Sequence, residues 1–151
     1  MQPELALLFE ASATLGPALT VGPTPAGIRR VVPITGGTFE GPQLRGTILA
    51  GGADWQYVRA DGVLVVEAQY LLRTTDEVLI QVHNSGLRHG PAEVLERIAQ
   101  GEDVDPREYY FRAIPTLIAP AGRYEWLNRR VFICSAARFV RAVRLWVYQL
   151  L

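Results

Sequence analysis

The chain has 151 residues, of which 49% are apolar and 20% are charged, and its formal net charge is +0. This length fits one domain with a hydrophobic core, and the composition excludes a mainly disordered segment. The balanced charge argues against a protein that binds nucleic acid or another polyanion.

The chain has one cysteine and no lysine, and these two counts exclude further classes of protein. The single cysteine, Cys134, excludes an internal disulfide and is typical of a reducing cytoplasm, where we expect the protein. The first residues lack a basic stretch, so we expect no signal peptide, and the apolar runs are too short to span a bilayer. Every basic residue is an arginine, which excludes Schiff-base chemistry through a lysine.

Alternating apolar and polar residues predict β-strands along most of the chain. Turn signals separate these segments, including a hairpin signal at Asp61-Gly62 and another at residues 74–76. In chain order, the first strands are predicted at residues 4–13, 27–37, 43–52, 54–62, 63–74 and 77–86.

One helix is predicted in the second half of the chain. Residues 91–100 begin with Pro91 and end before Gly101, and their apolar residues recur at helical spacing. Strands are predicted again at residues 107–119, 124–139 and 140–151. The last segment has some helical propensity, but its alternation favours a strand.

Two glycine pairs, Gly36-Gly37 and Gly51-Gly52, predict corners where strands bend. Eight to ten strands with one short helix are typical of a sandwich or a barrel. The glycine-rich corners favour a single antiparallel β-barrel of the calycin or lipocalin-like type over residues 1–151. Large side chains lie on both faces of the last strand, with Trp146 and Tyr148 on one of them, so we expect a homo-oligomer that covers them.

Several kinds of chemistry have no support in the sequence. His83 and His89 lack partners at metal-ligand spacing, and one cysteine cannot form a zinc site. Nucleotide-binding loops and a serine-nucleophile motif are absent. We therefore expect no metal and no cofactor, and the remaining side chains suit acid–base catalysis and anion binding.

Two carboxylates are candidates for proton transfer. Glu67 lies in the predicted strand 63–74 and faces either water or a partly polar cavity. In a cavity, desolvation would raise its pKa and suit it to acid–base catalysis. Asp54 follows the second glycine pair, where it either forms a turn beside a core tryptophan, Trp55, or lies at a cavity mouth.

Basic and aromatic residues supply candidate ligand contacts. Arg88 lies in a glycine-bounded loop before the predicted helix, where it can join an anion site. The segment "REYYFR" places Tyr109 on an aromatic face and Arg112 on a polar one, although a structural salt bridge also explains Arg112. Trp126 and Asn128 follow in "YEWLNRR", and a buried asparagine in a strand needs a partner that a ligand or a loop can provide.

These motifs resemble a known family. The blocks "GGTFEGPQLRGTILAGGADW", "RADG", "EAQYLLRT", "GLRHGP", "DPREYYFRAIP" and "YEWLNRRVF" span nearly the whole chain in a distinctive order. They are similar to the small barrels known as domain of unknown function 3237, also called uncharacterised protein family 0311. The resemblance implies a closed or nearly closed antiparallel barrel that tends to self-associate.

What the resemblance implies about function is less specific. Some members of the family are similar to enzymes of natural-product pathways or occur beside them, and one fungal branch is linked to ring closure by addition of a hydroxyl across an alkene. The family's motif positions correspond here to Asp54, Trp55, Glu67, Tyr70, Arg88, Tyr109, Arg112, Trp126 and Asn128.

Three hypotheses follow. The leading one is a cofactor-free isomerase, cyclase or lyase that acts on a small oxygenated organic molecule inside the barrel by general acid–base catalysis. The alternatives are a non-catalytic barrel that binds a small molecule and a structural oligomer with a filled core. In the leading hypothesis the catalytic residues are Asp54, Glu67, Arg88 and Arg112, and the substrate-binding residues are Trp55, Tyr70, Tyr109, Trp126 and Asn128.

Overall fold

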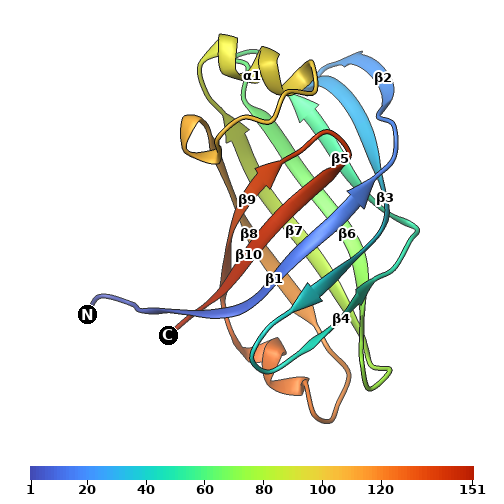
Figure 1. The fold of residues 1–151 in the computed structure, drawn as a ribbon, viewed down its shortest axis with the longest axis vertical. Helices are drawn as coiled ribbons and strands as arrows, with labels where there is room; N and C mark the ends of the chain where they lie inside the picture. Colours follow the sequence, from blue (N-terminus) through green and yellow to red (C-terminus); the bar gives the residue numbers. More distant parts are fainter.

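The computed structural model describes residues 1–151 and consists of ten strands, one α-helix and two short 3-10 helices (Figure 1). The helices are α1 (Ala92–Ala99), η1 (Pro106–Glu108) and η2 (Glu125–Arg129). The strands are β1 (Leu5–Leu15), β2 (Leu19–Thr24), β3 (Gly27–Glu40), β4 (Arg45–Ile48), β5 (Gly52–Val58), β6 (Leu64–Thr74), β7 (Leu79–His89), β8 (Tyr110–Ile118), β9 (Phe132–Arg138) and β10 (Ala142–Leu150).

The sheet closes on itself as an antiparallel barrel. β1 pairs with β10 on one side and with β3 on the other, which joins the two ends of the sheet. The order around the barrel is β1, β10, β9, β8, β7 and β6, followed by the short β4 and β5, which both lie between β6 and β3. β2 pairs only with β3 and lies outside this closed ring. The predicted single antiparallel barrel is confirmed.

Gly36-Gly37 lies within β3, at the point where this strand changes partners. Before the pair, β3 is bonded to β5 as far as Ile34, and after it β3 is bonded to β4 from Gly37 onward. Both glycines have positive φ angles, 151° and 140°. A Cβ on Gly37 would lie 2.1 Å from the backbone oxygen of Ser12 on β1. The predicted corner is therefore a bend inside one long strand, and only glycine allows the close approach of β1 there.

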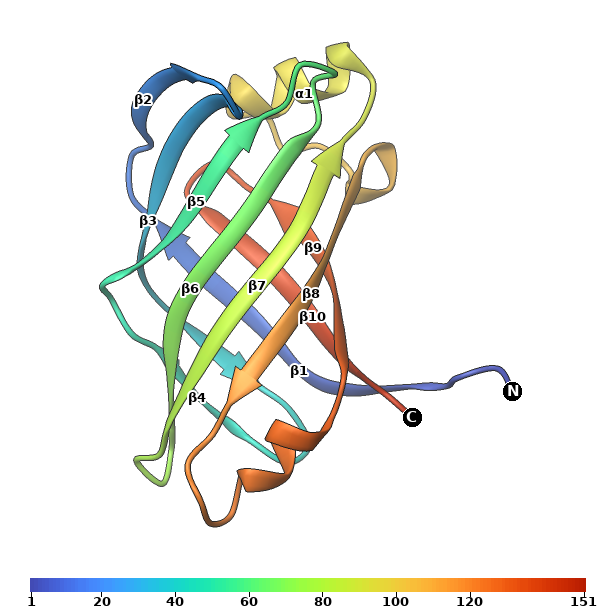
Figure 2. The same cartoon turned by 180° about the vertical axis from the view of Figure 1, so that it is seen from behind.

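The interior near η2 is filled by apolar side chains. Phe9, Phe39, Leu72 and Ile80 are buried there, and Leu127 of η2 closes this end of the barrel. The rings of Phe9 and Phe39 pack edge to face, with centroids 5.3 Å apart. At the opposite end, α1 covers the barrel and contributes the buried Val94 (Figures 1 and 2). Any ligand space must therefore lie toward the α1 end.

The predicted helix and the predicted last strand are both confirmed, as α1 and β10. The prediction of one strand over residues 124–139 is wrong in its first half, because residues 125–129 form η2. Asn128 causes much of this change, since its side chain accepts from the backbone N–H of Ala119 at 2.9 Å and donates to the Ala119 oxygen at 2.8 Å. These side-chain bonds replace a strand ladder. None of the helices has both the length and the apolar character that crossing a membrane requires.

The outer face carries an apolar groove of about 660 Å³ over β7 to β10. β8 and β9 pair at only two positions, so their outer side chains leave a hollow between the strands. Ile114 is 62% exposed in this groove, and Leu87 and Tyr110 are also exposed. The homo-oligomer stays a prediction, and this groove is the apolar outer surface that it would cover.

Substituting Gly37 tests the bend. Gly37→Ala should lower the free energy of unfolding by about 2–5 kcal/mol, because it combines a strained φ with a backbone collision. Gly51→Ala is the matched control, since Gly51 also has a positive φ but has no atom within 4 Å of the added methyl. It should cost about 1–2 kcal/mol. Urea unfolding of the two variants measures the difference, and equal costs would show that the approach of β1 is not the constraint.

The oligomer prediction is tested by light scattering of the wild-type protein and two variants. Ile114→Arg places a charge in the apolar groove and should shift the protein toward smaller species. Ile28→Arg is the control, because Ile28 is an exposed apolar residue on β3, outside the groove. A wild-type protein that is monomeric at micromolar concentration would contradict the prediction.

Candidate functional site

A small cavity lies inside the barrel, with a volume of about 50 Å³. Since one water molecule needs about 10–15 Å³ of such space, the cavity holds a group of roughly three to five non-hydrogen atoms. Ten of the fifteen lining residues are hydrophobic, and the polar ones come from β5, β7 and β9. The lining residues are Ala13, Leu15, Val32, Ile34, Asp54, Gln56, Val66, Ala68, Tyr70, Asn84, Arg88, Phe111, Arg138, Val143 and Leu145.

Asp54 is the only carboxylate in the lining of this cavity. β5 alternates, so Asp54 and Gln56 point inward while Trp55 points outward. The backbone N–H of Glu67 donates to Asp54 Oδ1 at 2.8 Å, and Gln56 Nε2 donates to Asp54 Oδ2 at 2.7 Å. One oxygen is thus held by the neighbouring strand β6 and the other by Gln56 of the same strand, β5.

Burial raises the pKa of the Asp54 carboxyl above its ordinary value. The two hydrogen bonds, from Gln56 and from the Glu67 backbone, and the charges of Arg88 and Arg30 act in the opposite direction but do not cancel the effect of burial. A carboxyl with a raised pKa can hold or release a proton closer to neutral pH than an exposed one.

A chain of hydrogen bonds supports this carboxylate from β3. Arg30 Nε donates to Gln56 Oε1 at 2.9 Å, which orients the Gln56 amide so that its nitrogen donates to Asp54. Arg30 lies opposite Gln56 in the β3–β5 ladder, and this register sets the geometry. Asp54 therefore interacts with a positive charge through an amide rather than through a direct ion pair.

Arg88 is the second charged group that points into the cavity. Burial lowers its pKa to about 10, and repulsion from Arg138 and Arg30 adds to this effect. Burial likewise lowers the pKa of Arg138. Arg88 keeps its charge at neutral pH, so three guanidinium groups lie around one carboxylate. This excess of positive charge favours an anionic ligand.

Two buried polar atoms at the cavity have no hydrogen-bond partner: Oδ1 of Asn84 and Nε of Arg88. Both residues lie on β7, four positions apart on its inner face. Buried polar atoms are almost always paired in proteins. One free acceptor and one free donor at the same small cavity are therefore available to a ligand.

Two other side chains near the cavity are neutral. Burial raises the pKa of the Tyr70 hydroxyl far above its ordinary value, with smaller contributions from Cys134 and Asp54. Burial raises the pKa of the Cys134 thiol to about 12, against hydrogen bonding from Asn84. Neither group is a proton carrier at neutral pH. No cluster of three or more histidine, cysteine, aspartate or glutamate residues is placed to hold a metal ion.

The structure brings three of the predicted site residues together at the cavity: Asp54, Arg88 and Tyr70. Arg88 lies in β7 and not in a loop, because its strand continues to His89. The expectation that Glu67 and Arg112 face the cavity is wrong. The side chain of Glu67 is 45% exposed on the outer face, with His83 Nε2 at 3.5 Å and Ser85 Oγ at 3.4 Å.

The remaining predicted residues lie outside the cavity lining. Arg112 is exposed and stacks over the ring of Tyr110, 5.4 Å from its centroid. Trp55 is 51% exposed on the outer face of β5 rather than part of the core. Tyr109 is buried, and its hydroxyl accepts from the backbone N–H of Arg138 at 2.9 Å, which is a structural contact.

Trp126 and Asn128 lie in η2, at the opposite end of the barrel from α1. Asn128 is exposed and bonded to the backbone, so it is not the buried strand asparagine that the sequence suggested.

Sequence reasoning missed Gln56, Asn84, Arg138 and Arg30. Strand alternation could have found two of them, since Gln56 is two residues from Asp54 and Asn84 is four residues from Arg88. Arg30 and Arg138 have no such signal, because their places depend on pairing between strands distant in the sequence.

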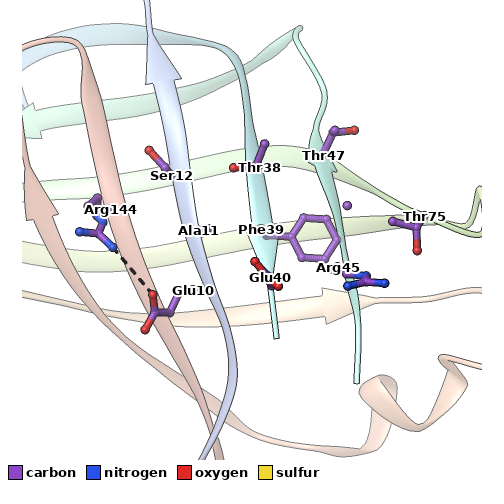
Figure 3. A pocket seen from close by; sticks show the side chains of 11 residues that line it. Glu10, Ala11, Ser12, Thr38, Phe39, Glu40, Arg45, Thr47, Thr75 and Arg144 are labelled. Carbon is purple, nitrogen blue, oxygen red and sulfur yellow. Dashed lines mark ion pairs between the residues drawn. The ribbon is translucent and has the colours of Figure 1, made fainter. Parts of the chain in front are cut away.

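A wider hollow of about 600 Å³ lies on the outer surface over β1, β3, β4 and β10 (Figure 3). Its charged side chains include the ion pair of Glu10 and Arg144, with 3.8 Å between oxygen and nitrogen. Glu40 and Arg45 lie opposite each other in the β3–β4 ladder. No unpaired buried polar atom lies in this hollow, so the interior cavity is the better candidate site.

Residues 3–150 match the family described as protein of unknown function (DUF3237), and the chain belongs to this family. It is 38% identical over 144 residues to a UPF0311 protein of Bradyrhizobium diazoefficiens, covering 95% of this chain and 94% of that one. The crystal structure of a conserved protein of unknown function from Rhodopseudomonas palustris is similar to it with a TM-score of 0.96 and 36% identity, covering 100% and 99% of the two chains.

More distant similarities lead to enzymes of Penicillium herquei. The chain is 37% identical over 83 residues to the hydroalkoxylation enzyme phnH, covering 55% of each chain. The crystal structure of an enzyme from the same fungus has a TM-score of 0.74 and 25% identity, covering 100% of this chain and 96% of that one.

The raised pKa of Asp54 predicts how stability depends on pH. The folded protein keeps this proton to a higher pH than the unfolded chain, whose value is near 3.8. The stabilisation is complete below pH 3.8 and is lost as pH rises through the folded pKa. Asp54→Asn removes the titration, so the Tm of the wild type minus that of the variant should fall as pH rises above 3.8. Calorimetry measures this difference.

Asp76 provides a control of opposite sign. Hydrogen bonding, first from the Tyr124 hydroxyl, lowers the pKa of Asp76, so its stabilisation is present above the unfolded value and is lost as pH falls. For Asp76→Asn, the same Tm difference should rise with pH. A difference for Asp54→Asn that also rises would show that burial does not dominate at Asp54.

Proposed function

We propose that this protein is a cofactor-free enzyme that transfers protons on a small oxygenated organic molecule bound inside the barrel, as an isomerase, cyclase or lyase. One observation carries the proposal. A half-buried carboxyl with a raised pKa lines the same interior cavity as a half-buried arginine whose Nε is buried and has no partner. Strongly perturbed titratable groups in a cavity are typical of functional sites.

In this proposal Asp54 is the proton carrier. Its hydrogen bonds to Gln56 and to the Glu67 backbone fix the direction in which each oxygen can accept a proton. The lining around Asp54 is mostly apolar, and in this proposal the proton passes directly between Asp54 and the bound molecule. A positioned acid or base of this kind contributes about 10²- to 10⁴-fold to the rate.

Arg88 supplies the complementary charge. When Asp54 takes a proton from the substrate, negative charge develops on a substrate oxygen, and a guanidinium with a free N–H stabilises that charge. Arg138 lines the same cavity, and its Nη1 bonds to the backbone oxygens of Phe139 and Ala142 hold it in place.

The likeness to the fungal hydroalkoxylation enzyme supports this class of reaction. Hydroalkoxylation adds a hydroxyl across an alkene: the oxygen bonds to one carbon, its proton is removed, and a proton is added to the other carbon. A carboxyl that both accepts and donates a proton can serve such a step. Ring closure in natural-product biosynthesis is the corresponding specific activity that we propose.

The alternative is a barrel that binds a small molecule without changing it. Aromatic side chains alone around the cavity would favour such a carrier, but the lining includes Asp54, Arg88 and Arg138. Titratable groups with perturbed pKa values favour the enzyme. Substitution of the Asp54 carboxyl would slow the turnover of an enzyme, whereas a carrier has no turnover to slow.

Deuterium incorporation tests the proposal because it detects proton transfer at carbon whatever the net reaction is. The protein is incubated in heavy water with a panel of small 2-oxo, 2-hydroxy and unsaturated hydroxy acids, and nuclear magnetic resonance follows exchange at carbon. The wild type should catalyse exchange on at least one compound, and Asp54→Asn should slow it by about 10²- to 10⁴-fold.

Glu67→Gln is the matched control for this experiment. Glu67 is the carboxylate on the neighbouring strand whose side chain points outward, so the exchange rate of this variant should equal that of the wild type. If Asp54→Asn retains the wild-type rate, Asp54 is not the proton carrier and the binding barrel becomes the better explanation.

A further inference from the structure

The charges at the cavity favour a ligand with one anionic group. Arg88 is half-buried, its Nε is buried without a partner, and its guanidinium is repelled by Arg138 and Arg30. The carboxyl in the same cavity, Asp54, is bonded to Gln56 and to the Glu67 backbone instead. Leaving this buried Nε without an acceptor is costly, and a carboxylate accepts guanidinium N–H groups with matched geometry.

The unpaired Oδ1 of Asn84 indicates that the same ligand carries a second group, which donates a hydrogen bond. Asn84 is 6% exposed, and its Oδ1 is buried without a hydrogen-bond partner. An amide oxygen accepts a hydrogen bond, so its complement is a donor such as a hydroxyl. A carboxylate cannot satisfy it.

Strand register places this acceptor at the level of the proton carrier. Asp54 lies opposite Ala68 in the β5–β6 ladder, and Ala68 lies opposite Asn84 in the β6–β7 ladder. Two strand spacings separate Asp54 from Asn84, roughly 10 Å between Cα atoms. The small side chain of Ala68 between them leaves room for a ligand atom within reach of both.

We infer that the cavity recognises a short hydroxycarboxylate group, whose carboxylate binds Arg88 and whose hydroxyl donates to Asn84 Oδ1 beside Asp54. The cavity volume of about 50 Å³ fits a group of this size. The inference rests on the proposed function, because it assigns the substrate class of the same interior site. A larger substrate would present this group at one end.

Three small probes test the inference by equilibrium titration with the wild-type protein. Glycolate carries both groups, acetate lacks the hydroxyl, and glycolamide lacks the charge. Glycolate should bind about three- to tenfold more tightly than acetate, the effect of one hydrogen bond. Glycolamide should bind at least about tenfold more weakly than glycolate, because it loses the charged contact with Arg88.

Variants assign each contact to its residue. Arg88→Gln should weaken glycolate and acetate alike, by about ten- to hundredfold. Asn84→Ala should remove only the preference for glycolate over acetate. Arg73→Gln, which changes an exposed arginine paired with Glu77, should bind all three probes as the wild type does. Equal affinity of glycolate and acetate for the wild type, or a preference that persists in Asn84→Ala, overturns the inference.

The titration contains no turnover step, so its failure differs from that of the proposed function. If the probes are not discriminated but exchange still depends on Asp54, the hydroxycarboxylate assignment alone is wrong. If the probes are discriminated as expected but Asp54→Asn exchanges normally, the ligand class holds and proton transfer by Asp54 is wrong. The wild-type comparison of probes remains decisive even where a variant does not fold.

Discussion

The bend of β3 at Gly36-Gly37 is the constraint on which the barrel and its cavity depend. It lets one strand pair with β5 along its first half and with β4 along its second half, while β1 completes the closure. β4 then encloses the end near η2, which apolar side chains fill. β5 encloses the end near α1 and brings Asp54 and Gln56 into the interior. A straight β3 would not divide the barrel in this way.

In the cavity, the pKa values of the charged side chains are set by low solvation rather than by ion pairing. Burial pushes the pKa of Asp54 upward and that of Arg88 downward, so each charged form is less favourable than in water. A direct ion pair would offset both effects. Instead, Gln56 stands between Asp54 and Arg30, and the Arg88 Nε stays free. The Gln56 amide therefore holds the Asp54 carboxylate in place without giving it a direct ion pair.

Local sequence pattern predicted the elements well and the site only in part. Alternation and turn signals are local, so the strands, α1 and the barrel could be inferred. The same alternation shows that Glu67 and Tyr70, three residues apart on β6, face opposite sides and cannot both line the cavity. Asn128 turns its segment into η2 through bonds to Ala119. The contact of Arg30 with Gln56 spans 26 residues and depends on barrel closure, which no local pattern records.

The unpaired atoms of Asn84 and Arg88 distinguish a functional interior from a structural one. A filled core of the kind near η2 would stabilise the barrel more, because an unsatisfied buried polar atom costs about 1–3 kcal/mol. The backbone ladders pair β7 with β6 and β8 along this stretch, and they need neither the Asn84 Oδ1 nor the Arg88 Nε. Unpaired buried polar atoms that do not stabilise the fold are expected at a site that binds a ligand. The cavity is therefore better explained by a ligand that satisfies one donor and one acceptor than by imperfect packing.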